Sequence, residues 1–466
     1  MVFSSIPFLY YFLPCALILY FITPKKLKNT ALLITSLVFY GWGEPKYLFL
    51  MVASIIVGYV AGLLIEAFSE KRVKKAVFIV STIIITGFLA VFKYADFFIQ
   101  SFNSVTGLSA GLLNLALPVG ISFYTFQILS YTIDVYRGGV PAQKNFINLA
   151  SYIALFPQLI AGPIVRYSDI ANQLKERTHS LEDFVNGAGR FVVGLSKKVL
   201  IANVLGELCT TFKASDDKSV LFYWLYAVAF ALQVYYDFSG YSDMAIGLGR
   251  IMGFRFVENF NYPYISKSAT EFWRRWHISL GSWFRDYIYI PLGGNRVSTP
   301  RHFFNIFVVW LLTGMWHGAA WNFVVWGLYF AVLLVIEKVF LLKQLEKSKV
   351  LSRIYTLFAV LISFVIFNAT DMGEAFSYLK GMLLLGGAPV ISAELLYCVK
   401  SYGVTLILGV VGATPIVKAL AEKLREGDKS QGLFYVLRPV VLVALLTAAT
   451  AYLVDGSFNP FLYFRF

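Results

Sequence analysis

The feature that most constrains this chain is a series of apolar runs, several of them long enough to cross a lipid bilayer. A helix needs about 20 apolar residues to span the roughly 30 Å hydrocarbon core. Hydrophobic residues make up 58% of the 466 positions and charged residues 14%, which excludes an ordinary soluble domain. The sequence therefore predicts an all-α, polytopic membrane protein. The apolar runs are residues 6–22, 30–42, 47–65, 76–92, 112–136, 146–160, 191–212, 220–238, 303–314, 321–342, 354–367, 395–417 and 436–454.

Two of these runs, 30–42 and 303–314, are too short to cross the bilayer untilted. Short helices persist at membrane depth only where protein or a water-filled cavity satisfies their ends. We therefore expect re-entrant helices around a funnel or tunnel. Neither internal repeats nor the similar halves of many transporters are apparent, and we expect one integral membrane domain, residues 1–466.

The charge distribution predicts an orientation in the membrane. Lys and Arg number 40 against 26 Asp and Glu, a net charge of +14, and basic loops usually lie in the cytoplasm. The basic loops 24–29 and 70–75 are separated by two crossings and a nearly neutral loop at 43–46. This pattern places the N-terminus outside the cytoplasm, and it makes the lipid bilayer, rather than nucleic acid, the reason for the charge.

The cysteines exclude several chemistries. Cys15, Cys209 and Cys398 lie far apart and form no C-x-x-C pair, so we expect neither a disulfide framework nor a metal site. A thiolate that carries an acyl group also loses support. The G-x-S-x-G match at 107–111 lacks the strand, turn and helix that a nucleophilic serine requires, so we treat it as chance.

One of the four histidines, His317, lies in the apolar sequence GMWHGAAW. An ionisable group in such a stretch is costly and is by default a functional hypothesis. Helical spacing places Trp310, Gly314, His317 and Trp321 on one face. Gly314 and Gly318 would let a neighbouring helix or a slim substrate approach closely. The alternative role is a structural histidine that hydrogen-bonds between helices.

A second histidine, His277, lies in EFWRRWHISLGSWFRDY at residues 271–287. This segment predicts an amphipathic helix at the membrane boundary. One stripe contains Trp273, Trp276, His277, Leu280, Trp283, Phe284 and Tyr287, and the other contains Arg274, Arg275, Ser279, Ser282, Arg285 and Asp286. Arg274 and Arg275 are suited to bind the phosphates of coenzyme A, or equally a lipid headgroup.

Two histidines facing an apolar interior suggest general-base chemistry, because neutral imidazole can remove the proton of an alcohol that attacks a thioester. Asp237 and Asp243 lie among tyrosines near the expected end of the 220–238 helix, where either can orient a histidine or bind an arginine. A structural link to Arg or Tyr is the alternative. The remaining histidines, His179 and His302, have polar neighbours, and we expect them at the surface.

These motifs resemble the membrane-bound O-acyltransferases, and in particular their bacterial alginate O-acetyltransferase branch. The resemblance covers the chain from its first third to about two-thirds along it, and the two histidine blocks are its most specific part. Residues 343–433 match only in apolar character. The motifs are LPVGISFY at 117–124, FPQLIAGPIVRY at 156–167, YDFSGYSDMA at 236–245, FWRRWHISL at 272–280, WFRDYIYIPLGG at 283–294 and GMWHG at 314–318.

The resemblance implies a ring of helices around a central tunnel, with the active-site core at about 117–330. It places His317 at the family's catalytic position and His277 at the second active-site position. It further implies a cytoplasmic acetyl-CoA donor, no bound cofactor, and a hydroxyl acceptor on an extracytoplasmic glycan of a bacterial cytoplasmic membrane. The residues expected to contact substrate are Trp316, Trp276, Trp321, Arg274, Arg275, Asp237 and Asp243.

The C-terminal tail, residues 455–466, ends in FLYFRF and carries a lone phenol, Tyr463. It is similar to the relay motif proposed for bacterial envelope acyltransferases, which implies that Tyr463 accepts the acyl group with His317 as base. A separate extracytoplasmic SGNH-type acetyltransferase would then complete the transfer. The alternative role for this tail is an interfacial aromatic anchor.

Two other functions remain open from the sequence. One is a D-alanyl or other acyl transfer protein that takes its group from a carrier-protein thioester. The other is a proton-coupled transporter or flippase whose buried histidines relay protons. A transporter would neither cleave acetyl-CoA nor carry a base-labile acetyl adduct.

Overall fold

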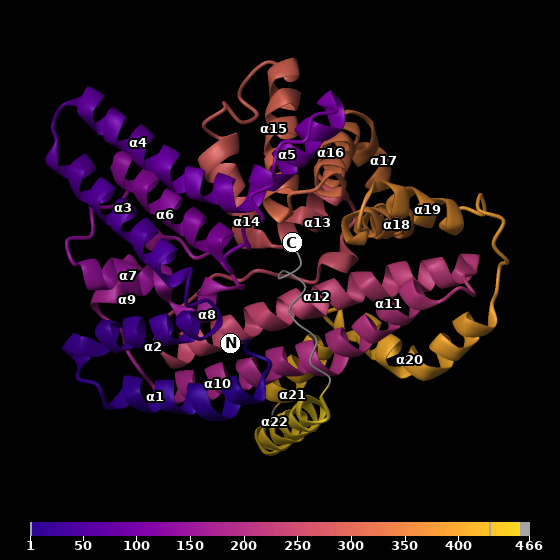
Figure 1. Ribbon diagram of the computed structural model, residues 1–466. Helices are drawn as coiled ribbons and strands as arrows, with labels where there is room; N and C mark the ends of the chain where they lie inside the picture. The colour runs from indigo at the N-terminus through magenta and orange to yellow at the C-terminus, as the bar shows by residue number, and fades with distance from the viewer. Residues whose placement is uncertain (1, 428–429, 457–466) are drawn as a thin grey trace. The chain divides into compact units, whose positions relative to one another are not determined.

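The computed structural model describes residues 2–427 and 430–456. Within these ranges the chain is helical and contains no β-strand (Figure 1), which confirms the predicted all-α class. By packing, the chain divides into two compact units. Unit 1 comprises Met1–Phe191 with Met244–Val257, and unit 2 comprises Val192–Asp243 with Glu258–Phe466. The expectation of a single domain over residues 1–466 stays a prediction.

The helices of the first part of the chain are mostly short. They are α1 (Leu13–Ile22), α2 (Lys28–Gly43), α3 (Leu48–Ala67), α4 (Lys71–Leu89), α5 (Ala95–Thr106), α6 (Ile121–Tyr136), α7 (Phe146–Ala154), α8 (Phe156–Leu159), α9 (Tyr167–Lys175) and α10 (Leu181–Ser196). Three short segments depart from α-helical geometry. Wider π-helical turns are η1 (Phe8–Phe12) and η3 (Ala90–Tyr94), and a tighter 3-10 turn is η2 (Lys25–Leu27).

The second part begins within α10 and contains the longest helix. Its helices are α11 (Val204–Ala214), α12 (Val220–Ile251), α13 (Ala269–Arg275), α14 (Ile278–Phe284), α15 (Thr299–His317), α16 (Trp321–Ile336), α17 (Leu342–Leu345), α18 (Lys349–Asn368), α19 (Met372–Met382), α20 (Ala393–Gly412), α21 (Ile416–Glu426) and α22 (Gln431–Val454). The irregular turns are η4 (Lys197–Asn203), η5 (Pro263–Ile265), η6 (Arg285–Tyr289) and η7 (Glu337–Leu341).

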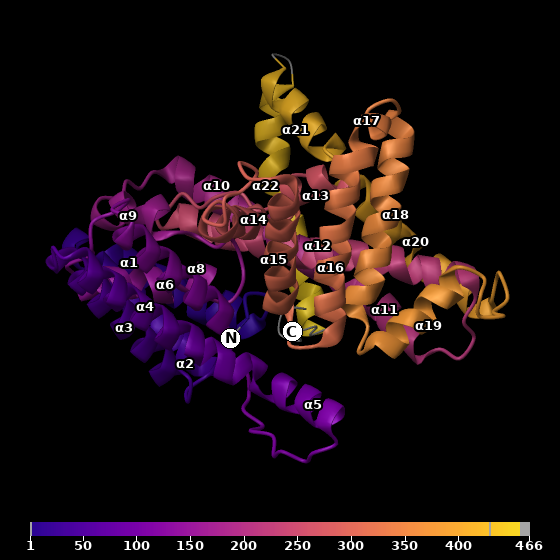
Figure 2. The same cartoon turned by 90° about the horizontal axis from the view of Figure 1, so that it is seen from above.

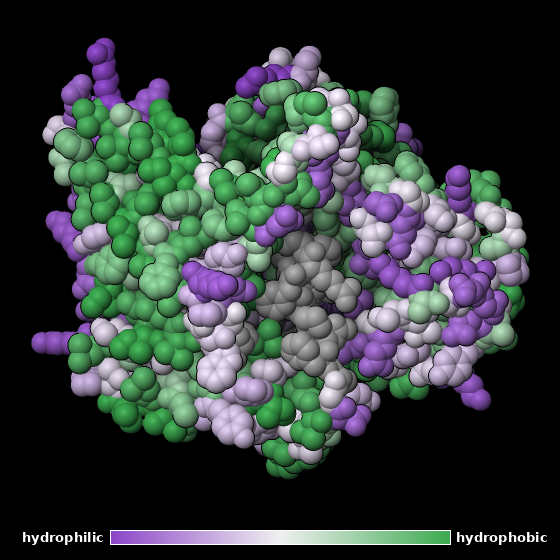
Figure 3. Space-filling view, in the orientation of Figure 1, coloured by the Kyte–Doolittle hydropathy of each residue, from purple (hydrophilic) through white to green (hydrophobic). Residues whose placement is uncertain are grey.

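In unit 1, α3 packs against α4 and α6, and α2 packs against α7. Small residues on α3 allow this close packing, because a side chain at Gly62 would meet the ring of Tyr131 on α6. The opposite surface of α3 and α4 exposes Val60, Val80 and Ile83. Figure 3 shows apolar side chains over these two helices, as expected for a surface that faces lipid.

In unit 2, α15 and α16 form a tightly packed pair, and α16 continues into contact with α18 (Figure 2). The short α13 packs against both α16 and α18. The core between these helices is rich in aromatic rings, with Trp326 and Phe330 1% and 0% exposed. This aromatic core surrounds the histidine-bearing segments.

Seven helical stretches in the described residues are long and apolar enough to cross a membrane. They correspond to seven of the predicted apolar runs, so the multi-pass prediction is confirmed. The stretches are Leu48–Ala67, Lys71–Thr106, Val220–Ile251, Trp321–Leu345, Lys349–Asn368, Ala393–Gly412 and Gln431–Val454.

Two predicted apolar runs are not continuous helices. The run 112–136 is helical only from Ile121, because Gly120 adopts a left-handed φ of +77° just before it. The run 146–160 divides into α7 and α8 at Leu155, whose ψ of +109° is not helical, and Pro157 lies in the first turn of α8, where its missing N–H interrupts no helical hydrogen bond. Apolar composition therefore did not predict where these helices begin and break, and residues 112–117 are exposed as well as non-helical.

Candidate functional site

The segment that carries His277 is not the one continuous helix that we predicted. Helix α13 ends at Arg275 and α14 begins at Ile278, with His277 between them in a left-handed conformation, φ +46°. A residue other than glycine rarely adopts this conformation, and such residues cluster at functional sites. The break therefore places His277 at a bend between two short helices.

A neighbouring loop explains why the helix breaks at this point. The backbone carbonyl of Asn259 accepts a hydrogen bond from the Ile278 N–H at 3.0 Å. The Asn259 side-chain Oδ1 accepts from the Ser279 N–H at 3.2 Å and the Ser279 hydroxyl at 2.9 Å. These bonds satisfy amide groups at the start of α14 that have no partner within the helix. The sequence analysis did not single out Asn259.

The start of α13 is fixed by a buried carboxylate, Glu337, which is 0% exposed. Its oxygens accept from the backbone N–H groups of Ala269 at 2.5 Å and Thr270 at 2.9 Å. The Ser268 hydroxyl also accepts from the Glu271 N–H. A carboxylate at this end of a helix also complements the helix dipole. Glu337 was not among the predicted site residues, although it lies within the predicted apolar run 321–342, where an ionisable residue is uncommon.

The predicted aromatic stripe of this segment is largely confirmed despite the break. Trp276, His277 and Trp283 are 5%, 1% and 3% exposed. Of the predicted polar stripe, Arg274 is exposed and Arg275 pairs with Glu271, Nε to Oε1, at 2.9 Å. Ser279 was wrongly placed on the polar stripe, because the backbone turns at His277 and buries it.

His317 is the last residue of α15 and is 5% exposed. Its imidazole lies among aromatic rings, with centroid distances of 4.9 Å to Trp326, 5.0 Å to Trp316 and 5.3 Å to Phe367. Trp310 and Gly314 share its buried face, as predicted. Trp321 does not, because α15 ends at His317 and Trp321 begins α16 with 57% of its surface exposed.

Glycines bring α15 and α16 into direct backbone contact near His317. A Cβ at Gly314 would strike the Phe323 carbonyl oxygen, and one at Gly327 would strike the Trp310 carbonyl oxygen. A Cβ at Gly318 would overlap the ring of Phe323. The predicted close approach of a neighbouring helix is therefore confirmed at Gly314. Any larger residue would push apart the pair of helices that holds His317.

Both predicted active-site histidines contact the indole ring of Trp316. Trp316 lies 5.0 Å from His317 and 5.9 Å from His277, between ring centroids. His277 also packs edge-on against Phe238 at 4.6 Å. Burial lowers the pKa of His277 to about 3, so the imidazole is neutral at physiological pH. Two buried imidazoles thus contact one indole ring.

The two aspartates lie in the middle of α12 rather than near its end, because the helix continues to Ile251. Asp243 pairs with Lys197 at 2.6 Å between Oδ2 and Nζ, and Asp237 pairs with Lys198. The Lys198–Asp237 pair is buried. The structural link that we considered is thus present, and its partners include lysines, which we did not predict.

Of the remaining histidines, His179 is exposed as predicted, and its Nε2 lies 2.8 Å from the Tyr20 hydroxyl. His302 is buried, which corrects its predicted surface position. Its Nε2 lies 2.9 Å from the Tyr289 hydroxyl and 3.1 Å from Lys338 Nζ. Tyr463 lies outside the described residues. Within those residues no three or more His, Cys, Asp or Glu side chains form a potential metal site.

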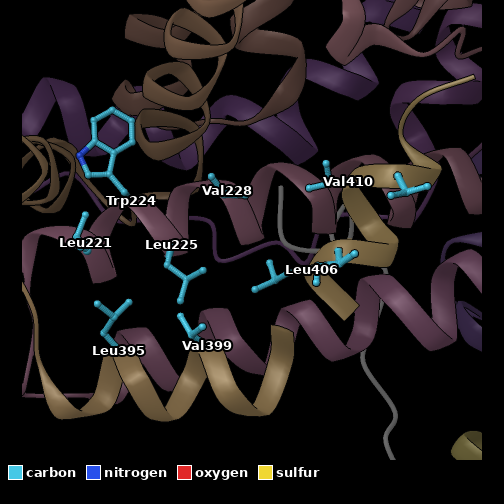
Figure 4. Close-up of a pocket in the computed structure, with 10 residues that line it drawn as sticks. Leu221, Trp224, Leu225, Val228, Leu395, Val399, Leu406 and Val410 are labelled. Carbon is cyan, nitrogen blue, oxygen red and sulfur yellow. The ribbon is translucent and has the colours of Figure 1, made fainter. Parts of the chain in front are cut away.

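An apolar groove of about 570 Å³ lies between α12 and α20 (Figure 4). Neither histidine lines this groove. Its lining residues are Leu221, Trp224, Leu225, Val228, Leu395, Val399, Leu406, Ile407, Val410 and Val411. Both helices are candidate membrane spans, so the groove is suited to contact lipid chains rather than a charged substrate.

Comparison with known proteins identifies the family. The model of the membrane-bound O-acyltransferase family matches residues 139–372, a stretch that includes both histidines. A probable alginate O-acetylase of Azotobacter vinelandii is 39% identical over the full length of both chains. A peptidoglycan O-acetyltransferase of Helicobacter pylori is 33% identical, covering 83% of this chain and 80% of its own. A teichoic acid D-alanyltransferase of Bacillus subtilis is 30% identical, covering 54% and 67%.

These matches agree with the motifs of the sequence and with the multi-pass helical fold. They also favour an acyltransferase over the transporter that the sequence left open. The chain is a multi-pass membrane enzyme, an acyltransferase, and it belongs to the membrane-bound O-acyltransferase family.

Proposed function

We propose that this enzyme moves an acetyl group from a cytoplasmic thioester, acetyl-CoA, toward hydroxyl groups of an extracytoplasmic polysaccharide, with His317 as general base. The observation that carries the proposal is the pair of buried imidazoles, His317 and His277, that contact the Trp316 indole. Neutral imidazole is the side chain best suited to take a hydroxyl proton near neutral pH.

The chemical step follows from the position of His317. Its imidazole removes the acceptor's hydroxyl proton while the hydroxyl oxygen attacks the thioester carbonyl carbon. The carbon–sulfur bond breaks, an ester forms, and the leaving thiolate takes the proton back from the imidazolium. The rings of Trp316, Trp326 and Phe367 shield the imidazole from bulk water, which disfavours competing hydrolysis of the thioester.

The donor side of the proposal rests on the α13 arginines. Arg274 is exposed and can pair with a phosphate of coenzyme A, while Arg275 is partly engaged by Glu271. Trp276, Trp316 and Trp321 are proposed to contact the substrate. The ion pairs of Asp237 and Asp243 with lysines leave both aspartates with a supporting role, unless substrate displaces a lysine.

The acceptor side of the proposal uses the C-terminal tail. Tyr463 accepts the acetyl group as a phenyl ester, with His317 as its base, and a separate extracytoplasmic SGNH-type acetyltransferase passes the group to the glycan. The enzyme then lies in a bacterial cytoplasmic membrane with its N-terminus outside. The names of the relatives, which act on alginate and peptidoglycan, support a polysaccharide as the final acceptor.

The test uses purified full-length protein in detergent with acetyl-CoA labelled in the acetyl group. We expect coenzyme A release to fall by about 10²–10⁴-fold in His317→Ala, the size of a general-base contribution. The matched control is His302→Gln, which changes another buried histidine of the same helix and should keep release near the wild-type rate. Labelled protein should accumulate in the wild type but not in Tyr463→Phe.

Three outcomes would contradict parts of this scheme. Equal release by His317→Ala and wild type removes His317 as base. Equal labelling of Tyr463→Phe and wild type removes the tyrosine relay. Turnover only with an acyl carrier protein thioester, and none with acetyl-CoA, replaces the proposed donor with a carrier protein.

A further inference from the structure

Asn259 lies between α12 and α13 and is 1% exposed. Its Oδ1 is 3.1 Å from His277 Nδ1, 3.2 Å from the Ser279 backbone nitrogen and 2.9 Å from the Ser279 hydroxyl. Its Nδ2 is 3.1 Å from the Ser242 hydroxyl. One buried amide therefore connects α12, the bend at His277 and the start of α14.

The orientation of this amide is determined by its surroundings. The Ser279 backbone N–H can only donate, so the atom that faces it must be the amide oxygen and not the NH₂ group. The NH₂ group then points to the Ser242 hydroxyl, which can accept. The reversed amide would set two donors against each other at the start of α14.

The amide orientation decides which ring nitrogen of His277 carries the proton. A neutral imidazole has one N–H and one lone pair, and His277 is neutral because burial lowers its pKa to about 3. Asn259 Oδ1 has no proton to give. The Ser279 hydroxyl is 3.5 Å from His277 Nδ1 but donates to Oδ1 at the shorter distance of 2.9 Å, so His277 Nδ1 is the donor across its 3.1 Å contact with Asn259. The proton is thus on Nδ1, and the lone pair is on Nε2.

The other nitrogen, Nε2 of His277, is buried and has no hydrogen-bond partner within the described residues. Buried polar atoms are normally paired, and an exception calls for an explanation. The ring contacts Trp316, which also contacts His317. A hydroxyl group bound at this centre would supply the donor that the lone pair of Nε2 requires.

We propose that Asn259 is a positioning residue that fixes His277 in its Nδ1–H tautomer and so presents Nε2 as a hydrogen-bond acceptor to the acyl acceptor's hydroxyl group. The hydroxyl as ligand rests on the proposed function, whereas the tautomer follows from the geometry alone. A consequence is a division of roles between the histidines. Neutral His277 cannot donate from Nε2 to an oxyanion, so it orients the hydroxyl while His317 takes the proton.

The test reads the tautomer directly by NMR on full-length protein with ¹⁵N-labelled histidine. Only four histidines occur in the chain, so single His→Gln variants assign each signal. In the wild type at neutral pH, His277 should show a protonated Nδ1 and a nonprotonated Nε2. Asn259→Leu, which has a similar shape but no acceptor, should move the proton toward Nε2.

Two further variants serve as controls. Asn259→Asp keeps an oxygen acceptor for both His277 and Ser279, so it should keep the Nδ1–H tautomer. Ser242→Ala removes only the partner of the amide NH₂ group and should also keep it. A wild-type spectrum with the proton on Nε2 overturns the inference, and so does an unchanged tautomer in Asn259→Leu. The wild-type spectrum decides even if Asn259→Leu does not fold.

Acetyl-CoA turnover tests the role of the hydroxyl separately. Asn259→Leu should lose about 10–100-fold in acetyl transfer, the effect typical of an outer partner that orients a functional histidine, and Asn259→Asp should recover part of it. If turnover of Asn259→Leu equals wild type although its tautomer changes, the hydroxyl is not the ligand of Nε2. If wild type shows the expected tautomer but no turnover with any thioester, the proposed function fails while the tautomer stands.

Discussion

The two histidines at Trp316 differ in their surroundings. His277 sits at a left-handed bend and is fixed by the polar side chain of Asn259. His317 ends a long helix and is enclosed by the rings of Trp316, Trp326 and Phe367, with α16 packed against its helix through Gly314 and Gly327. A hydrogen bond to Asn259 therefore orients one imidazole, and closely packed aromatic rings surround the other.

This difference has a chemical reason. A hydrogen bond fixes both the direction of an imidazole and its tautomer, which suits a group that must present one particular lone pair. Aromatic rings packed around an imidazole hold its position and shield it from water, which suits the proton transfer that we propose for His317. The comparison predicts that damage to packing affects His317 most, and that changes in protonation or backbone conformation affect His277 most.

The largest effect should come from the packing around His317. In Gly314→Ala the new Cβ meets the Phe323 backbone carbonyl, which cannot move aside as a flexible side chain would. We expect a loss of about 1–3 kcal/mol in unfolding free energy, together with lower acetyl transfer because α15 and α16 separate. Unfolding by denaturing detergent measures the first effect, and acetyl-CoA turnover measures the second.

The matched control is Gly403→Ala on α20, where a Cβ would meet nothing within 4 Å. Alanine has the higher helix propensity, so this variant should be equally or slightly more stable than wild type. If both glycine variants change stability alike, the close contact of α15 and α16 does not position His317.

The next largest effect should be a dependence of the unfolding free energy on pH that is caused by the His277 imidazole. Burial lowers its pKa from 6.5 to about 3, so between these values the unfolded chain binds a proton that the folded chain does not. Stability should fall as the pH drops below 6.5, by at most about 1.4 kcal/mol per unit. His277→Asn should lose this slope. Unfolding free energies at pH 7, 6 and 5 compare the two proteins, and parallel curves would contradict the assignment.

The membrane spans and the buried aromatic stripe could be predicted well from the sequence, whereas the local backbone geometry could not. The seven candidate spans follow from runs of apolar residues, and the buried stripe containing Trp276 and Trp283 follows from helical periodicity. The bend at His277 does not, because FWRRWHISL contains no proline or glycine at the break. The hydrogen bonds of Asn259 impose the bend, and that residue is 18 positions away in the chain.

The site shows the same limit. His277 and His317 stood out because ionisable residues are rare in apolar sequence, and the structure brings both to Trp316. Asn259 carried no comparable signal, since a neutral amide beside an apolar run is common at helix ends. Glu337 did carry one, because it is an ionisable residue within the apolar run 321–342, but it was not recognised as part of the site. Their roles depend on tertiary partners, namely the starts of α14 and α13.

We expect the smallest effect from the strained backbone at His277. Alanine and glycine at this position both remove the imidazole and differ from each other only by one methyl group. In an ordinary helix, glycine is less stable than alanine by roughly 0.5–1 kcal/mol. At the left-handed position 277, alanine instead meets a penalty of about 1–2 kcal/mol that glycine avoids. His277→Gly should therefore be more stable than His277→Ala, whereas on the exposed face of α13 Arg274→Ala should be more stable than Arg274→Gly. Denaturant unfolding of the four variants gives their unfolding free energies. If the alanine variant is the more stable one at both positions, the bend is not a fixed feature of the fold.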